Sequence, residues 1–303
     1  MSLDADQVVE RRRLKRRLVF WRVLGIAAVV AAVIAAVGRF DLVGSKDHIA
    51  RITIAGIIID DQTRDEALKG VAKDDKVKAL VVKIDSPGGT YVGGEAVYQS
   101  LRKVADKKPV VVMMGTTAAS AGYMSALAGD HIVARASTLT GSIGVLLQTA
   151  NINDLMDKVG VKPIIIKSAP LKAQPNPMEH FSPEARKVTE ELVADFFDMF
   201  VSLVSERRSM SKEKVLKLAD GRAFSGRQAL ANGLVDAIGA EAEVRKWLAE
   251  THKIADDLPI KDVKVVDDIK TWRDLLDSKI GKVLFSERLS LDGVISLWQP
   301  NLW

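Results

Sequence analysis

Two valine-rich runs separated by an amphipathic stretch constrain the fold of this chain more than any other feature. Residues 78–84 and 109–114 are typical of buried strands, and between them residues 92–105 place Val97, Leu101 and Val104 on one helical face. A helical crossover of this length joins parallel strands. Further strands are predicted at residues 51–59, 131–134, 143–147 and 162–166, and further helices at 66–73, 154–159 and 182–210. We therefore predict an α/β fold with a mostly parallel sheet.

The N-terminal segment predicts a membrane anchor. Residues 23–38 carry no charge, and with residues 18–22 they form a stretch that as a helix would be about 31 Å long, enough for a bilayer core of about 30 Å. A basic run of residues 11–17 precedes it, and this places the N-terminus in the cytoplasm. We predict a cytoplasmic basic segment (1–17), a transmembrane anchor (18–38) and a connector (39–50). A cleaved signal peptide is the alternative, because small residues lie near Ala35 and Gly38.

The charge and cysteine content exclude several functions. Residues 1–22 hold seven basic and three acidic residues, whereas the rest of the chain holds 37 basic and 36 acidic residues. The net positive charge therefore reflects topology, and it gives no support to nucleic-acid binding. The chain has no cysteine, which excludes a thiol nucleophile, disulfides and cysteine metal sites. We expect no cofactor and no metal.

Two loops of small residues contain groups suited to acyl transfer. Ser120 lies in a run of small residues directly after the predicted strand 109–114, and Gly88 and Gly89 follow the strand 78–84. A serine hydroxyl supplies a nucleophile, and a backbone N–H in a glycine turn can stabilise an oxyanion. Together, in this order, the two loops predict an acyl-transfer site.

The base for this serine is less certain from the residues alone. The histidines, which are the usual partners, have no orienting partner that the sequence reveals; they are His48, His131, His180 and His252. A lysine kept neutral by burial is the other choice. Lys172 stands in a mostly apolar, proline-rich stretch, and Lys167 is its local competitor.

Four motifs resemble those of the half-length signal peptide peptidase A (protease IV) family of Ser–Lys peptidases, over residues 52–238. They are residues 85–89 (DSPGG), 118–123 (AASAGY), 139–145 (LTGSIGV) and 221–236 (GRAFSGRQALANGLVD). The resemblance implies that Ser120 is the nucleophile and Lys172 the general base, with Ser142 orienting the lysine. The oxyanion donors would be the backbone N–H groups of Gly89 and Ala121. Two departures are a missing glycine at Ala121 and the absence of aromatic and acidic neighbours around Lys172.

The same resemblance implies a Clp protease/crotonase-like fold of ββα units over residues 51–255, and we predict a helical extension at 256–303. It also implies a membrane-tethered homo-oligomeric ring in the bacterial inner membrane, with the catalytic domain on the periplasmic side. Its substrates would be apolar peptides, the remnants of signal peptides. A crotonase-like acyl-thioester enzyme and a non-catalytic membrane scaffold are the alternatives.

The C-terminal tail carries two tryptophans, Trp298 and Trp303, each preceded by a leucine. Aromatic residues of this kind favour interfaces. The tail is therefore predicted to touch the bilayer, to occupy a neighbour's peptide groove, or to pack on its own domain.

Overall fold

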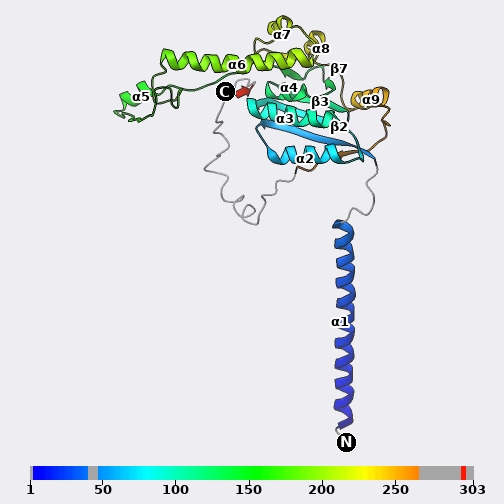
Figure 1. Cartoon of the computed structure of the whole chain (residues 1–303). Coiled ribbons are helices and arrows are strands. Elements are labelled where there is room, and N and C mark those ends of the chain that lie inside the picture. The colour runs from blue at the N-terminus through cyan, green and yellow to red at the C-terminus, as the bar shows by residue number, and fades with distance from the viewer. Residues whose placement is uncertain (1–2, 40–46, 266–294, 298–303) are drawn as a thin grey trace. The chain divides into compact units, whose positions relative to one another are not determined.

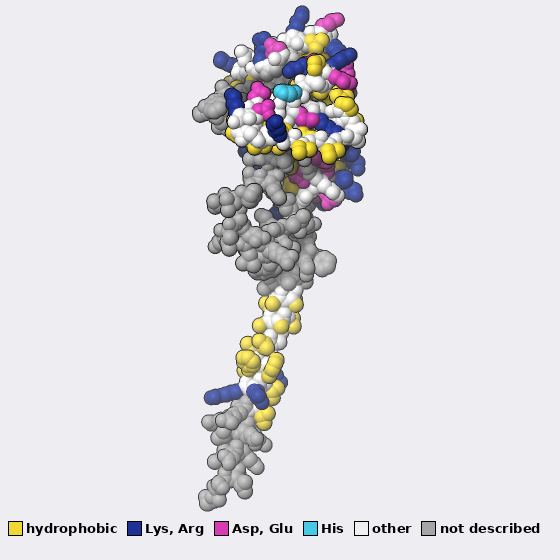
Figure 2. All heavy atoms as spheres, turned by 90° about the vertical axis from the view of Figure 1, so that its left-hand side faces the viewer, with side chains coloured by type: hydrophobic (Ala, Val, Ile, Leu, Met, Phe, Trp, Pro, Cys, Tyr) yellow, Lys and Arg dark blue, Asp and Glu magenta, His cyan; other side chains and the backbone are white. Residues whose placement is uncertain are grey.

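The computed structural model describes residues 3–39, 47–265 and 295–297. It divides into two compact units, Met1–Lys46 and Asp47–Trp303. The first unit is helix α1 (Leu3–Arg39), whose side chains are described for residues 14–32. Large hydrophobic side chains are exposed there, as Figure 2 shows. Within the described part of the chain, no helix is both long and apolar enough to cross a membrane. The anchor at residues 18–38 stays a prediction.

Three parallel strands form the centre of the second unit: β1 (His48–Ile58), β2 (Val77–Thr90) and β3 (Val110–Ala119). Helix α2 (Gln62–Lys73) connects the first two strands and helix α3 (Tyr91–Ala105) the next two, as Figure 1 shows. A short strand β8 (Ile260–Asp262) adds to the outer side of β1. The sequence prediction of parallel strands linked by helices is confirmed.

Helices cover both faces of this sheet, because its central strands carry apolar side chains on both faces. Leu80, Val82 and Ile84 face the main core, which helices α2, α3 and α6 (Pro183–Arg207) complete. Val81 faces the opposite way and packs with Leu248 of α9 (Glu241–His252). A strand buried on both faces reads as a continuous apolar run, and this explains why the sequence predicted it.

Strand β3 has two different neighbours along its length. Its first part pairs with β4 (His131–Ala134), and its last part pairs with β5 (Leu139–Gly141). Strand β5 is antiparallel to β6 (Ala223–Ser225), and β4 is parallel to β7 (Ala237–Ile238). The sheet is therefore mixed. Strand β3 ends beside β5, and helix α4 (Ala121–Ala126) begins two residues after the end of β3.

Helices are the main regular elements in the described part of the C-terminal half. Its helices are α5 (Asn153–Lys158), α6 (Pro183–Arg207), α7 (Lys212–Leu218) and α8 (Gly226–Asn232). The C-terminal part of α6 packs into the core through Phe200, Val201 and Val204. Figure 1 shows α5 and the start of α6 projecting beyond the sheet. This projecting part contains the segment with Lys172.

Two predicted strands are wrong. Residues 143–147 form no strand, because the strand in this region is β5, which ends at Gly141. Residues 162–166 also form no strand, and Ile164 and Ile166 are 90% and 94% exposed. Their β-branched side chains favour a strand, but none of the strands that the structure describes pairs with them. In the predicted helical extension at 256–303, the described elements are strands β8 and β9 (Ile295–Leu297), and residues 266–294 lie outside the description.

Candidate active site

Ser120 occupies a sharp turn between β3 and α4. Its backbone angles are φ 56° and ψ −121°, a conformation that costs free energy for any residue with a Cβ. The turn is held by two hydrogen bonds, from Ser120 N–H to the Gly141 carbonyl (2.8 Å) and from Met124 N–H to the Ser120 carbonyl (2.9 Å). A strained strand-to-helix turn is how hydrolases of other folds present a nucleophilic serine. Ser120 is only 1% exposed in the chain by itself.

Ser142 lies beside this turn because of the strand register. Ala119 and Gly141 are the last residues of the parallel strands β3 and β5 and pair with each other, so Ser120 and Ser142 directly follow this pair. Ser142 also has a positive φ (48°), and its N–H donates to the Arg222 carbonyl at 3.0 Å. The structure thus brings together two of the predicted site residues, both buried.

The glycine turn reaches the same region from β2. Ser86 pairs with Ala118, so Gly88 and Gly89 continue the strand beside the Ser120 turn. The Ser86 hydroxyl accepts a hydrogen bond from Gly88 N–H at 3.1 Å. A Cβ at Gly89 would lie 1.9 Å from the Ile58 carbonyl oxygen, so only glycine fits. The sequence predicted that the strand ends at residue 84, before these glycines, but β2 continues through them to Thr90 because β1 pairs with both of them.

Ala121 is the first residue of α4, and the first N–H groups of a helix have no acceptor within the helix. Tight packing fixes its position: a Cβ at Gly94 of α3 would lie 3.0 Å from the Ala121 Cβ, and one at Gly122 would lie 3.0 Å from the Ser86 carbonyl oxygen. The start of α4 is therefore held against both α3 and the β2 turn.

Lys172 is exposed, in the segment between α5 and α6. Its competitor Lys167 forms an ion pair with Glu179 (2.5 Å) and donates to the Pro170 carbonyl at 3.4 Å. Hydrogen bonds from Lys167 and Asn176 hold the pKa of Glu179 below its ordinary value. Lys167 is thus engaged as a charged partner. The structure does not bury Lys172 as a neutral base requires, at least in the single chain.

The histidines lie at other elements. Burial lowers the pKa of His131, whose ring stacks on Trp247 with centroids 4.9 Å apart. His180 contacts Asn153 at 2.7 Å, and His252 packs against Trp247. His48 is buried at the start of β1, and the glycine turn is at the far end of the β1–β2 pair. In the part of the chain that the structure describes, no group of three His, Asp or Glu could hold a metal ion.

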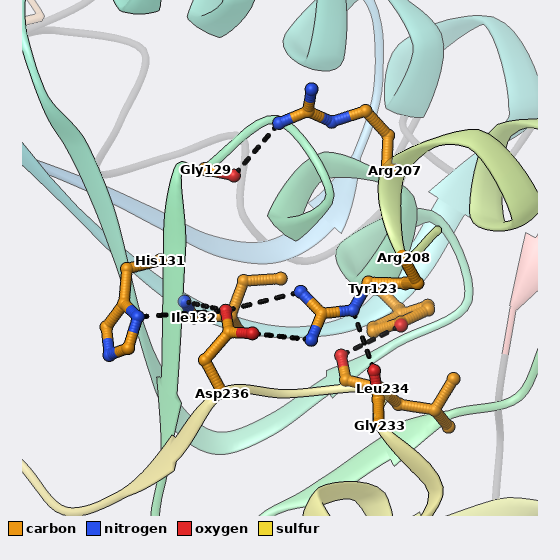
Figure 3. Close-up of polar contacts among 9 residues, drawn as sticks. All are labelled: Tyr123, Gly129, His131, Ile132, Arg207, Arg208, Gly233, Leu234 and Asp236. Atoms are coloured by element: carbon orange, nitrogen blue, oxygen red, sulfur yellow. Dashed lines mark hydrogen bonds and ion pairs between the residues drawn. The ribbon is translucent and has the colours of Figure 1, made fainter. Parts of the chain in front are cut away.

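A polar network that the sequence did not reveal supports α4, and its Tyr123 end is fully buried (Figure 3). The Tyr123 hydroxyl donates to the Leu234 carbonyl at 2.9 Å, and burial raises the pKa of this tyrosine. The Arg208 guanidinium donates to Asp236 at 2.6 Å. Asp236 in turn accepts from Ile132 N–H of β4 at 2.8 Å. The network joins the helix after Ser120 to β4, the end of α6 and the loop before β7.

Comparison with known proteins assigns this arrangement to a family. The model of peptidase family S49 matches residues 102–255, which include Ser120, Ser142 and Lys172, and the Clp protease model matches residues 47–149, which include the glycine turn. The chain belongs to peptidase family S49. It is accordingly a serine peptidase, and the Clp protease match agrees with its mixed α/β sheet.

The relatives that match this chain differ from one another in how much of their length the match covers. A candidate protease of Synechocystis sp. is 41% identical over 68% of this chain and 74% of its own length. A candidate signal peptide peptidase SppA of Enterococcus faecium is 36% identical over 62% of this chain, and Protease 4 of Haemophilus influenzae is 32% identical over 75% of it. The matches span only 55% and 38% of those two proteins. A ClpP1 mutant structure from Listeria monocytogenes superposes with a TM-score of 0.40 and 18% identity, over 63% of this chain and 91% of that one.

Proposed function

We propose that this chain is a membrane-anchored serine endopeptidase that cleaves apolar peptides, in particular remnants of signal peptides, through a Ser120–Lys172 dyad. The observation that carries the proposal is the strained turn at Ser120, placed by strand register beside both Ser142 and the glycine turn. Backbone strain persists only where the surrounding structure enforces it, and it is concentrated at functional sites.

The proposed reaction proceeds through an acyl-enzyme. The Ser120 Oγ attacks the carbonyl carbon of the scissile peptide bond while its proton moves to the Lys172 amine. The oxyanion then receives hydrogen bonds from Gly89 N–H and Ala121 N–H. When the C–N bond breaks, the lysine ammonium returns its proton to the leaving amine. Lys172 then takes a proton from a water molecule, which attacks the ester carbonyl carbon. When the C–O bond to Ser120 breaks, the lysine ammonium returns that proton to the Ser120 Oγ, and the peptide leaves as a carboxylic acid.

Burial of Lys172 requires a covering surface, and we propose that a second copy of the chain supplies it within a homo-oligomeric ring. Among the described residues of the second unit, most of the exposed large hydrophobic side chains lie on residues 146–199, the segment that contains Lys172. Assembly through this segment would desolvate the lysine and favour its neutral form. Ser142 would then accept or donate a hydrogen bond that holds the amine toward Ser120.

A hollow beside the segment that follows Ser142 suits apolar substrates. A cavity of about 450 Å³ lies between residues 145–147, which follow Ser142, and helix α6. Its lining includes Leu146, Phe181 and Phe197 and is mainly apolar. We assign it to substrate side chains, because apolar pockets of this size bind apolar groups.

The anchor and the location are part of the proposal. The uncharged stretch of residues 18–38 and the basic run before it support a single-pass anchor with a cytoplasmic N-terminus. The relative named SppA supports signal-peptide remnants as substrates. Both point to the bacterial inner membrane, with the peptidase unit on the periplasmic side.

The test is peptidase activity of the chain, in detergent, on an apolar fluorogenic peptide. We expect Ser120→Ala and Lys172→Ala to abolish turnover and Lys167→Ala to keep it, with folding and assembly matched among the variants. Activity that survives in Ser120→Ala would exclude the serine mechanism and favour the scaffold or the acyl-thioester enzyme. Loss in Lys167→Ala with activity in Lys172→Ala would assign the base to the other lysine.

A further inference from the structure

The pairing between β2 and β3 is irregular just before the nucleophile turn. Ile84 pairs with Met114, but the next pair is Ser86 with Ala118, so β3 uses four residues where β2 uses two. The extra residues form a bulge within residues 115–117 of β3. Bulges are over-represented next to active sites, where they redirect a side chain. The direction in which β3 delivers the nucleophile therefore depends on this bulge.

The same segment of β3 changes its neighbour on the other side. Met113 is the last residue that pairs with β4, and Thr117 is the first that pairs with β5. Backbone groups in such a break need other hydrogen-bond partners. Side chains supply them: the Thr138 hydroxyl donates to the Gly115 carbonyl at 2.7 Å, and Thr117 N–H donates to Asp85 Oδ1 at 3.0 Å. The bulge is thus held by side chains from both flanking segments.

Asp85 is the residue of β2 between the two regular pairs, and its carboxylate packs on the bulge. A Cβ at Gly115 would lie 2.8 Å from Asp85 Cγ and 3.0 Å from its Oδ2, so the carboxylate lies against the backbone there. A hydrogen bond from an N–H to a carboxylate is roughly twice as strong as one between neutral groups. The next residue, Ser86, accepts from Gly88 N–H at 3.1 Å. Asp85 therefore connects the glycine turn to the strand that carries the nucleophile.

We propose that Asp85 is a positioning residue for peptide hydrolysis: its carboxylate fixes the bulge and thereby sets the place of Ser120 relative to the oxyanion donor Gly89. The inference rests on the proposed function. Both groups must reach the same scissile carbonyl, and an error of about 1 Å costs about 100-fold in rate. Loss of one bulge residue from the register would move the strand by about 3.3 Å. The bond from Thr117 N–H to Asp85 therefore acts on kcat through Ser120.

The experiment measures hydrolysis of an apolar fluorogenic peptide by the full-length chain in detergent. Asp85→Ala removes the acceptor, and we expect kcat to fall by about 100-fold with KM little changed. Asp85→Asn keeps an acceptor oxygen at the same reach, so kcat should fall by less than about tenfold. Asp85→Glu keeps the charge, but its extra methylene does not fit against Gly115, and we expect a loss of at least about tenfold.

Asp130→Ala is the matched control. The Asp130 carboxylate accepts from Val110 N–H at the start of the same strand, also at 3.0 Å, and it pairs with Arg102. This hydrogen bond lies at the end of β3 that is farther from Ser120. We expect Asp130→Ala to lower Tm by an amount similar to Asp85→Ala, with kcat unchanged. Equal losses of kcat in the two variants, or an unchanged kcat in Asp85→Ala, would overturn the positioning role.

A second measurement does not depend on turnover. In the Ser120→Ala background, we expect Asp85→Ala to speed amide hydrogen exchange at Thr117, and Asp85→Asn and Asp130→Ala to leave it slow. Unchanged exchange in Asp85→Ala would overturn the proposal. If the parent chain shows no Ser120-dependent turnover, the proposed function fails and the positioning role with it, whereas the exchange result still shows whether Asp85 holds the bulge. If Asp85→Ala does not fold, Asp85→Glu takes its place with the loss of kcat given above.

Discussion

The backbone N–H of Ser120 donates a 2.8 Å hydrogen bond to the carbonyl oxygen of Gly141, and this bond ties the proposed nucleophile to the strand that carries Ser142. Residues 120, 141 and 142 all have positive φ angles, of 56°, 76° and 48°. The backbones of Ser120 and Ser142 are therefore both strained, whereas glycine adopts the positive φ of residue 141 freely, and the hydrogen bond holds the two turns together. Phe224 of β6 packs directly against Gly141 and closes the arrangement from the far side.

Replacing Gly141 with alanine should damage the site. The new Cβ would lie 2.6 Å from the Phe224 ring, in a backbone conformation that alanine disfavours. We expect kcat to fall by at least tenfold, because the Ser120 turn must shift with Gly141. The measurement is steady-state hydrolysis of an apolar fluorogenic peptide.

Gly160→Ala is the matched control. Gly160 has nearly the same φ (75°), but no atom lies within 4 Å of its would-be Cβ. We expect the strain alone, a loss of about 1 kcal/mol in the free energy of unfolding, with kcat unchanged. Equal effects of the two substitutions on kcat would contradict the role of Gly141 in holding Ser120.

The glycine turn gives a second prediction. A Cβ at Gly89 would meet the Ile58 carbonyl oxygen at 1.9 Å, and a backbone atom cannot give way as a flexible side chain can. The proposed oxyanion donor would be displaced, and loss of one such donor costs about 100-fold or more in kcat. We therefore expect Gly89→Ala to reduce turnover by at least that factor.

Gly70→Ala, in the interior of α2, provides the contrast. Nothing lies within 4 Å of its would-be Cβ and its φ is ordinary for a helix. Alanine should stabilise the second unit by about 0.5–1 kcal/mol, since glycine in a helix loses more conformational entropy on folding. Thermal unfolding checks this, and a lower Tm in Gly70→Ala would count against the described packing of α2.

The strands and helices of the sheet centre could be predicted because one physical signal controls them. Leu80, Val82 and Ile84 are buried on one face and Val81 on the other, so an unbroken apolar run marked β2. The same signal predicted a strand at residues 162–166, and this prediction is wrong. Ile164 and Ile166 have the same strand preference, but a strand also needs a neighbour, and local sequence carries no information about one.

The site was predictable in its residues but not in its geometry. The small-residue run around Ser120 and the glycine pair mark loops, and their resemblance to a peptidase family suggested roles. The positive φ of Ser120 could not be foreseen, because a serine rarely adopts it and only tertiary contacts such as that to Gly141 enforce it. The support below α4 depends on the Tyr123–Leu234 and Ile132–Asp236 hydrogen bonds, whose partners are 111 and 104 positions apart, and the sequence has no visible pattern for such pairs.

Tyr123→Phe tests that support. The substitution keeps the buried ring but leaves the Leu234 carbonyl without its hydroxyl donor. We expect a loss of about 1–2 kcal/mol in the free energy of unfolding, the usual cost of one buried hydrogen bond. Tyr98→Phe is the control, since Tyr98 is only half-buried, and its effect should be smaller. Denaturant unfolding followed by tryptophan fluorescence measures both, and equal losses would argue against the Leu234 contact.

His131 gives the protein a predicted pH dependence. Burial lowers the pKa of this histidine in the folded state, against the opposing attraction of Asp236 3.9 Å away. The unfolded chain, with an ordinary pKa of about 6.5, therefore binds the proton more tightly. Folding stability from this group is fully present above about pH 6.5 and is lost as the pH falls from there through the lowered pKa of the folded state. In His131→Phe, whose ring can still stack on Trp247, this part of the acid sensitivity should disappear. Thermal unfolding from pH 8 to pH 5 measures the difference, and a parallel loss of Tm in both proteins would show that His131 does not titrate as described.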